Sequence, residues 1–133
     1  MTLFQRLRNM VLISIRRKKH YSMHYKMWSY IVVHLLDDSD ELLDDTDYII
    51  KLKKMFLKLN NCGDIYGDCF LCDLYFGTQE KGCAGCPIYN KYSIPCTSVY
   101  SLFTIICDKS NKRDKRIKAA KMIRDCVLRK GGK

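Results

Sequence analysis

CFLC at residues 69–72 is followed after ten residues by CAGCP at residues 83–87, and these two C-x2-C pairs decide which fold the chain is expected to adopt. A gap of two residues lets both sulfurs of a pair turn toward one ion, and four thiolates complete a tetrahedral zinc site. A site closed in this way is structural, and metal binding organises a loop that is too polar and too rich in glycine to pack by itself. We therefore predict a structural zinc ion on Cys69, Cys72, Cys83 and Cys86.

Other cysteines and another metal group leave alternatives to this ligand set. Cys96 is close enough to the second pair to replace one of the four ligands, and Cys62 could also join them. Cys107 and Cys126 lie in apolar, helical surroundings and are expected to be buried as small hydrophobic residues. Four cysteines also hold iron–sulfur clusters, and a proline directly after a ligand, such as Pro87, is compatible with that chemistry. Zinc is preferred because the chain lacks a compact run of three cysteines.

The redox compartment decides between metal binding and disulfide formation for these cysteines. Eight cysteines in 133 residues exceed what ordinary cytosolic proteins carry but stay below the content of disulfide scaffolds. The apolar run at residues 11–15 is short and is followed by four basic residues, which is the reverse of the charge order in a secretory leader. We therefore expect a reducing compartment, where closely spaced cysteines bind metal more often than they form disulfides.

Apolar residues recur at helical spacing on both sides of the cysteines, which predicts a small, mainly α-helical domain with an inserted zinc-binding loop or knuckle. The stripes run through His24, Trp28, Ile31 and Leu35; through Ile49, Leu52, Phe56 and Leu59, with Lys51, Lys53, Lys54 and Lys58 mostly on the remaining faces; and through Ile117, Ala120, Ile123 and Val127. The length fits one domain, 1–133, with a basic extension or docking helix at 1–22, helices at 23–60, the zinc-binding segment at 62–96 and C-terminal helices at 97–130.

Residues 3–15 carry their own helical pattern. Leu3, Phe4, Leu7, Met10 and Val11 form its apolar stripe, and Arg6 and Arg8 lie off it. Basic amphipathic helices bind anionic lipid, so a membrane-surface or targeting role is open, but a docking helix or an extension is the preferred interpretation. The apolar runs fall far short of the roughly 20 residues that span a bilayer, so no transmembrane segment is expected.

The net charge of +10 is distributed unevenly. Residues 1–28 carry seven basic residues and no acid, residues 109–133 carry eleven basic residues against two acids, and seven acids fall within residues 37–47. Two basic ends attract the phosphate backbone of a nucleic acid, while no base-reading motif is present. The residues expected to bind nucleic acid or a partner are Arg16, Arg17, Lys18, Lys19, Lys112, Arg113, Lys115, Arg116, Lys118 and Lys121, and those of the last helix are expected to point largely outward.

The order of these features resembles a recurrent group of small uncharacterised phage and prophage proteins over about residues 23–129. The shared features are Trp28 in an early helix, the C-F-x-C and C-x-x-C-P pairs, Cys96 and a basic late helix. The extension before Met23 and the acidic stretch depart from that pattern. The resemblance implies a phage-type accessory protein that acts in the bacterial host cytoplasm, of a kind that often antagonises defence nucleases or nucleic-acid machinery, as anti-CRISPR proteins do.

Binding rather than catalysis is the function that the sequence predicts. No phosphate loop, nucleophile elbow or dinucleotide fingerprint is present, so neither an enzyme nor a small-molecule substrate is expected. We expect a zinc-stabilised protein that binds nucleic acid or a host nucleoprotein complex and inhibits a host defence nuclease. The alternatives are a pure protein inhibitor whose acidic stretch occupies a basic channel of a host effector, and an iron–sulfur protein.

Overall fold

The chain is mainly α-helical, as its sequence predicts. The computed structural model describes residues 2–65, 68–75, 86–93 and 101–128, and these residues form seven helices and no strand. The three long helices are α1 (Leu3–Asp37), α3 (Tyr48–Leu59) and α7 (Arg113–Asp125). The four short helices are α2 (Asp40–Leu43), α4 (Phe70–Tyr75), α5 (Pro87–Tyr92) and α6 (Leu102–Cys107).

α1 is one unbroken helix of 35 residues. The sequence patterns suggested a separate extension over residues 1–22, but the first 36 residues contain neither Gly nor Pro, so nothing ends the helix between its two parts. Thr2 and Gln5 form a capping box at its start: the Gln5 N–H donates to Thr2 Oγ1 at 3.1 Å, and the Thr2 N–H donates to Gln5 Oε1 at 2.9 Å. The extension is therefore helical and continuous with the first core helix.

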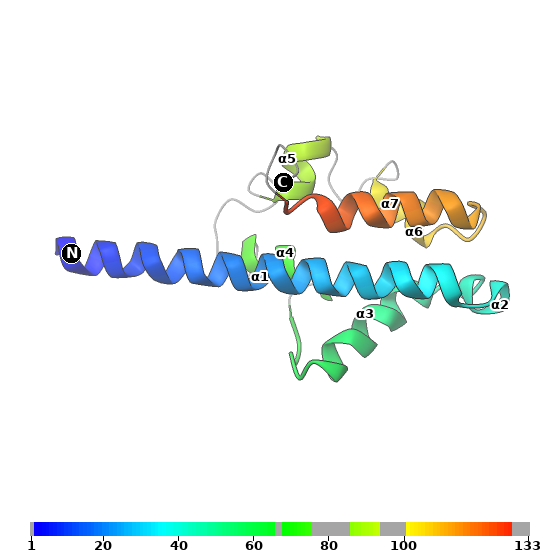
Figure 1. Cartoon of the computed structure of the whole chain (residues 1–133), viewed down its shortest axis with the longest axis horizontal. Helices are drawn as coiled ribbons and strands as arrows, with labels where there is room; N and C mark the ends of the chain where they lie inside the picture. Colours follow the sequence, from blue (N-terminus) through cyan, green and yellow to red (C-terminus); the bar gives the residue numbers. More distant parts are fainter. Residues whose placement is uncertain (1, 66–67, 76–85, 94–100, 129–133) are drawn as a thin grey trace.

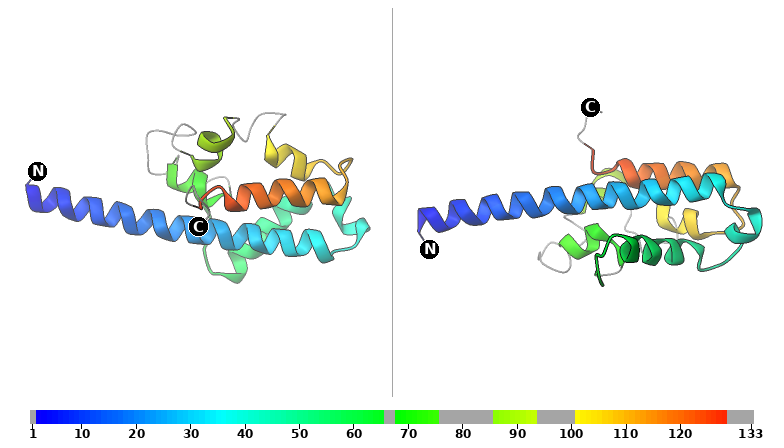
Figure 2. Two further views of the ribbon diagram at one scale, coloured as in Figure 1. Left: turned by 45° about the horizontal axis from the view of Figure 1, so that its top comes forward. Right: turned by 60° about the horizontal axis from the view of Figure 1, so that its bottom comes forward.

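The other helices pack around the C-terminal half of α1. α7 lies alongside that half and runs in the opposite direction, α3 and α4 also contact α1, and α6 packs against α7 (Figure 1). The N-terminal part of α1, dark blue in the figures, extends well beyond this body in every view (Figure 2). No helix among the described residues has the length and apolar character needed to cross a membrane.

The core confirms most of the predicted apolar stripes. His24, Trp28, Ile31 and Leu35 on α1 are each at most 2% exposed. Ile49, Leu52 and Phe56 on α3, and Ile117, Ala120 and Ile123 on α7, are also buried. Leu59 is 66% exposed, so its predicted burial is wrong, because α3 ends at that residue. Val127 is half-buried, since it lies past the end of α7.

The first half of the cysteine segment packs into the same core. α4 buries Phe70, Leu71, Leu74 and Tyr75, and the Phe70 ring meets the Phe56 ring edge to face at a centroid distance of 6.4 Å. The expectation that this segment is too polar to pack by itself is therefore wrong for residues 69–75. Apolar burial already holds this helix on α1 and α3.

Candidate functional site

Cys69 and Cys72 are brought together at the start of α4. Cys69 directly precedes the helix and is buried, and its carbonyl accepts the Asp73 N–H at 2.8 Å. A hydrogen bond with Cys72 holds the pKa of the Cys69 thiol well below its usual value; desolvation opposes this shift, while the charge of Lys53 and interaction with His24 reinforce it. The pair thus favours a thiolate, which is the form of cysteine that binds metals.

Lys53 is buried next to this pair, which the sequence analysis did not anticipate. Its side chain comes from α3 and is only 6% exposed. The ammonium nitrogen lies 4.4 Å from the centroid of the Phe103 ring and 5.4 Å from that of the Trp28 ring, so two aromatic faces stabilise the cation. The sequence feature that indicates burial of Lys53 is its spacing, because it lies four residues after Ile49 and four before Leu57, and both of these residues are buried.

His24 is the third buried polar side chain of this group, beside Cys69 and Lys53. Its Nε2–H donates to the Ile123 carbonyl at 2.8 Å, and the Cys126 sulfur lies 3.7 Å from the same nitrogen. Burial lowers the pKa of His24, because desolvation disfavours the charged imidazolium. Neither His24 Nδ1 nor Trp28 Nε1 has a hydrogen-bond partner among the described residues, although both atoms are buried.

The described residues do not bring the predicted zinc ligands together as a set. Cys86 is buried at the N-cap of α5, but no group of three or more His, Cys, Asp or Glu side chains within those residues is arranged to hold a metal ion. Cys83 and Cys96 lie outside the described residues. Cys62 is half-buried and donates to the Asn60 carbonyl at 3.6 Å. The Cys69 and Cys72 pair is therefore the part of the predicted centre that the structure assembles.

The described cysteines also bear on the disulfide alternative. None of the six, Cys62, Cys69, Cys72, Cys86, Cys107 and Cys126, forms a disulfide with another described cysteine. Cys126 is buried, as predicted, whereas Cys107 is only half-buried. Burial raises the pKa of the Cys107 thiol, which keeps it protonated and weakens it as a metal ligand.

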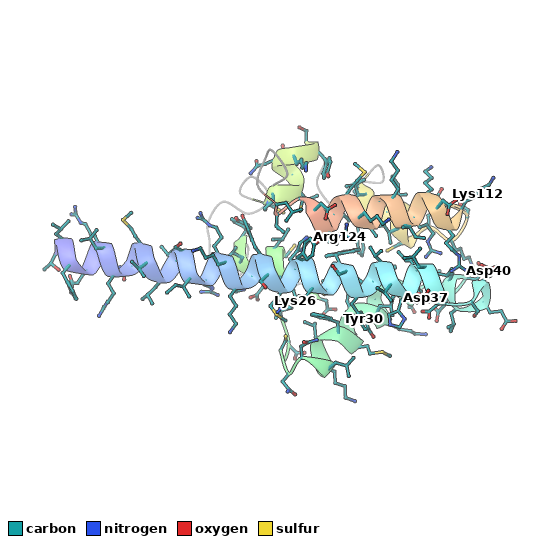
Figure 3. All side chains as sticks on the ribbon, in the orientation of Figure 1. Lys26, Tyr30, Asp37, Asp40, Lys112 and Arg124 are labelled. Carbon is teal, nitrogen blue, oxygen red and sulfur yellow. The ribbon has the colours of Figure 1, made fainter. Side chains whose placement is uncertain are left out.

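Four of the predicted binding residues form an exposed basic row on α7. These residues are Lys112, Lys115, Lys118 and Lys121, and none of them forms an ion pair with a described carboxylate. Lys112 stands at the start of α7, near the end of the molecule that carries Asp40, and Arg124 lies toward the other end of the helix (Figure 3). We call Lys112, Lys115, Lys118 and Lys121 the lysine row.

The other two predicted residues of α7 support the fold instead of pointing outward. Arg116 is 2% exposed and donates to the carbonyls of Ile106 at 2.7 Å and Leu43 at 3.0 Å. Arg113 donates to the Leu35 and Asp38 carbonyls and pairs with Asp40 at 2.6 Å. The prediction that these side chains point outward is therefore wrong for Arg116, which is buried, and only partly right for Arg113, which is half-buried. Both guanidinium groups turn inward because they donate to the unpaired carbonyls at helix ends.

The basic segment of α1, residues 16–19, ends fewer than two helical turns before Tyr25, where Arg124 at the end of α7 contacts this helix. Arg16, Arg17, Lys18 and Lys19 are all exposed. Arg16 and Lys19 line an open groove of about 550 Å³ that also includes Leu12, Ile15 and Phe70. The Arg124 guanidinium lies 5.4 Å from the Tyr25 ring centroid and so connects the end of α7 to α1.

The acidic stretch at residues 37–47 is partly neutralised within the fold. Asp38 accepts the Tyr48 hydroxyl at 2.6 Å and lies 2.9 Å from His34 Nδ1. Asp45 pairs with Lys51 at 2.5 Å, and Asp40 pairs with Arg113. Three of the seven acids therefore serve helix ends and internal ion pairs.

Comparison with known proteins leaves the site to be interpreted from its own geometry. No family model matches the chain. No curated protein and no solved structure matches it either.

Proposed function

We propose that this protein binds the phosphate backbone of a nucleic acid, alone or within a nucleoprotein complex, and does not act as an enzyme. The observation that carries the proposal is the lysine row, whose four ammonium groups are exposed on one helix and form no ion pair with a described carboxylate. Lysines that are not neutralised by the protein itself remain available to displace the counterions of a polyanion, which is the main driving force for non-specific nucleic-acid binding.

The basic segment of α1 extends this surface. α7 runs toward residues 20–25 of α1, and Arg124 stacks on Tyr25 where the two helices meet. Residues 16–19 continue the positive charge beyond that point. An extended positive surface of this kind suits a polymer of phosphates better than a small anion, since each additional phosphate contact releases further counterions.

A structural zinc ion is part of the proposal. Cys69 and Cys72 would supply two ligands, and the second pair, Cys83 and Cys86, with Cys96 as the alternative, would supply the rest. The close contact of Cys69 with Cys72 and the lowered pKa of Cys69 support this assignment, because a metal-binding thiol must lose its proton. An iron–sulfur cluster on the same cysteines is the alternative cofactor.

The biological setting that we propose comes from the resemblance to small phage and prophage proteins. In that setting the protein acts in the bacterial cytoplasm and inhibits a host defence nuclease or its nucleic-acid complex, as anti-CRISPR proteins do. The competing hypothesis places the acidic stretch in a basic channel of a host protein. The fold favours the first hypothesis, since Asp38, Asp40 and Asp45 are already engaged within the molecule whereas the lysine row is not.

Direct binding by the isolated chain tests the proposal. Fluorescence anisotropy with a labelled duplex DNA and a labelled single-stranded RNA should show binding that the double variant Lys118→Gln/Lys121→Gln weakens by about tenfold or more at low salt. The matched control is Lys54→Gln/Lys58→Gln, which removes the same charge from exposed positions on α3. Equal losses in both variants, or no binding by the wild-type chain, would contradict a nucleic-acid surface on α7.

A further inference from the structure

The solvent-facing side of α1 is apolar near the N-terminus of the helix and becomes basic and polar farther along it. Steps of three and four residues stay on one side of an α-helix. One such series consists of Phe4, Leu7, Val11, Ile15, Lys18, Ser22, Tyr25, Ser29, Val33 and Leu36, of which all are exposed apart from the half-buried Ser29. We call this series the outward row. Its first four residues are all apolar and are between 52% and 72% exposed, so the N-terminal part of α1 presents a continuous hydrophobic strip to solvent.

The described residues of the body leave Phe4, Leu7 and Val11 uncovered, while Ile15 borders the groove that also includes Phe70. The buried residues of α1 are His24, Met27, Trp28, Ile31, Val32 and Leu35, which lie on other sides of the helix and in its C-terminal half. The N-terminal part of α1, which carries Phe4, Leu7 and Val11, therefore extends beyond the body (Figure 2). A flat surface could meet the strip along its length without displacing any packed residue.

Charge decides what kind of surface fits the strip. No acidic residue occurs in α1 before Asp37, while Arg6 and Arg8 accompany the strip and residues 16–19 follow it. A second copy of this helix would set basic residues against basic residues in either direction, which opposes pairing. A nucleic-acid backbone would leave the four apolar side chains in water. An anionic lipid surface matches both properties, because apolar side chains enter the acyl boundary while arginine and lysine reach the head groups.

We propose that residues 3–19 of α1 bind the surface of an anionic phospholipid bilayer. Phe4, Leu7, Val11 and Ile15 enter the interface, and the surrounding Arg and Lys side chains contact phosphate and carboxylate head groups. The helix lies in the plane of the membrane, and the body stays on the aqueous side because its packed face is turned away from the outward row. This inference does not rest on nucleic-acid binding, since the apolar strip takes no part in the proposed nucleic-acid surface, and the two proposals share only the basic residues 16–19.

Flotation with lipid vesicles tests this proposal on the full chain. Vesicles of phosphatidylcholine with 30% phosphatidylserine, about the charge of an acidic leaflet, should bind the wild-type chain at least about tenfold more strongly than phosphatidylcholine alone. Leu7→Glu/Val11→Glu should abolish binding, because it places two carboxylates within the strip. The control Val33→Glu changes an exposed residue of the same row within the body and should bind like wild type. Circular dichroism should show equal helix content in all three proteins.

Tryptophan fluorescence quenching tests whether the strip enters the bilayer. Trp28 is 2% exposed, so quenchers on the lipid chains should not reach it. In Phe4→Trp, brominated acyl chains should quench the added tryptophan when vesicles are present. Lack of quenching, or equal binding to charged and uncharged vesicles, overturns the proposal. So does loss of binding in Lys118→Gln/Lys121→Gln but not in Leu7→Glu/Val11→Glu.

Two other binding partners of the strip, a second copy of the chain and an acidic protein surface, would give different results. If wild-type chain dimerises in light scattering, ignores vesicles and becomes monomeric with Leu7→Glu/Val11→Glu, the strip binds a second copy and the membrane proposal is wrong. If polyglutamate binds more tightly than vesicles and the same variant abolishes that binding, an acidic protein surface is the occupant instead.

Discussion

At the scale of single residues, Arg116 differs most from its prediction, because it was expected to point outward and is buried. Its guanidinium is buried and donates to the Ile106 and Leu43 carbonyls, so it joins α6, α7 and the end of α2. Burial lowers the pKa of this guanidinium, but the group stays charged because its usual pKa is so high. An arginine in this position supports the fold and is not available to a ligand.

Replacing Arg116 tests this assignment. Arg116→Met keeps the apolar length of the side chain but leaves the two carbonyls without their donor, so the free energy of unfolding should fall by about 2–3 kcal/mol. The neighbouring exposed Lys115→Met should change it by less than about 0.5 kcal/mol. Urea denaturation measures both. Similar values for the two variants would mean that Arg116 does not hold these helix ends.

Asp38 gives the fold a dependence on pH. Desolvation acts to raise its pKa, but hydrogen bonds from Tyr48 and His34, together with the charge of Arg113, hold the pKa below the usual value of 3.8. A carboxyl with a lowered pKa in the folded state contributes its full stability above that value, and the contribution is lost as the pH falls through the folded-state pKa. The protein should therefore lose stability in acid, below about pH 4.

The variant Asp38→Asn should reveal this contribution. At pH 7 it should lower the free energy of unfolding by about 1 kcal/mol, and the difference from wild type should shrink as the pH falls below 3.8. Asp37→Asn, an exposed neighbour, serves as the control. Thermal melts at several pH values provide the measurement. A difference that stays constant between pH 7 and pH 2 would rule out the charge of Asp38 as its cause.

At the scale of elements, α1 consists of a packed half and an unpacked half within one helix. A proline introduced into a packed helix removes a hydrogen bond and clashes with the preceding turn, which costs about 3 kcal/mol or more. Ser29→Pro should therefore strongly lower the midpoint of urea unfolding, whereas Ser14→Pro, in a stretch of exposed residues, should leave it nearly unchanged. Loss of stability in Ser14→Pro equal to that in Ser29→Pro would show that the N-terminal half packs on the body in solution.

The long elements could be predicted from sequence because their burial follows simple periodicity. Trp28, Ile31 and Leu35 recur at helical spacing, and all three are buried on α1. Ile117, Ala120 and Ile123 do the same on α7. In these stretches the absence of Gly and Pro agrees with the apolar pattern, so local and tertiary preferences point to one structure.

The remaining features could not be predicted because they depend on which helix ends meet. Arg116 and Lys53 are buried although their residue types favour solvent, since carbonyls and aromatic rings from distant segments surround them. Periodicity placed Lys53 among exposed lysines and gave no sign of Phe103, which is fifty residues away. The cysteine spacing predicted that Cys69 and Cys72 meet, but it gave no sign that α4 also packs into the core through Phe70 and Leu71.

At the scale of the whole molecule, a metal assay distinguishes a zinc-stabilised fold from a purely apolar one. Elemental analysis of native protein should find one zinc ion per chain, and Cys72→Ser should lose it, whereas Cys107→Ser should retain it. A chelator should lower the melting temperature of wild type but not of Cys72→Ser. A brown protein containing iron would support the iron–sulfur alternative, and protein without metal would remove the cofactor from the account.

The layout of charge and apolar surface places the two proposed binding regions on different parts of the molecule. The lysine row lies on α7, and the apolar strip lies at the far end of α1, beyond the body (Figure 1). Variants in the lysine row should leave vesicle binding intact, and variants at Phe4, Leu7 and Val11 should leave nucleic-acid binding intact, because each of these residues belongs to one region only. Only the basic segment at residues 16–19 adjoins both regions, so its substitution should weaken nucleic-acid and vesicle binding together.

The salt dependence of nucleic-acid binding tests the central proposal most directly. Each lysine that contacts a phosphate adds about 0.9 to the slope of the logarithm of the association constant against the logarithm of salt concentration. Lys118→Gln should therefore reduce the steepness of that slope by about one, while Lys54→Gln should leave it unchanged. Identical slopes for wild type and both variants would contradict the assignment of the lysine row to phosphate contact.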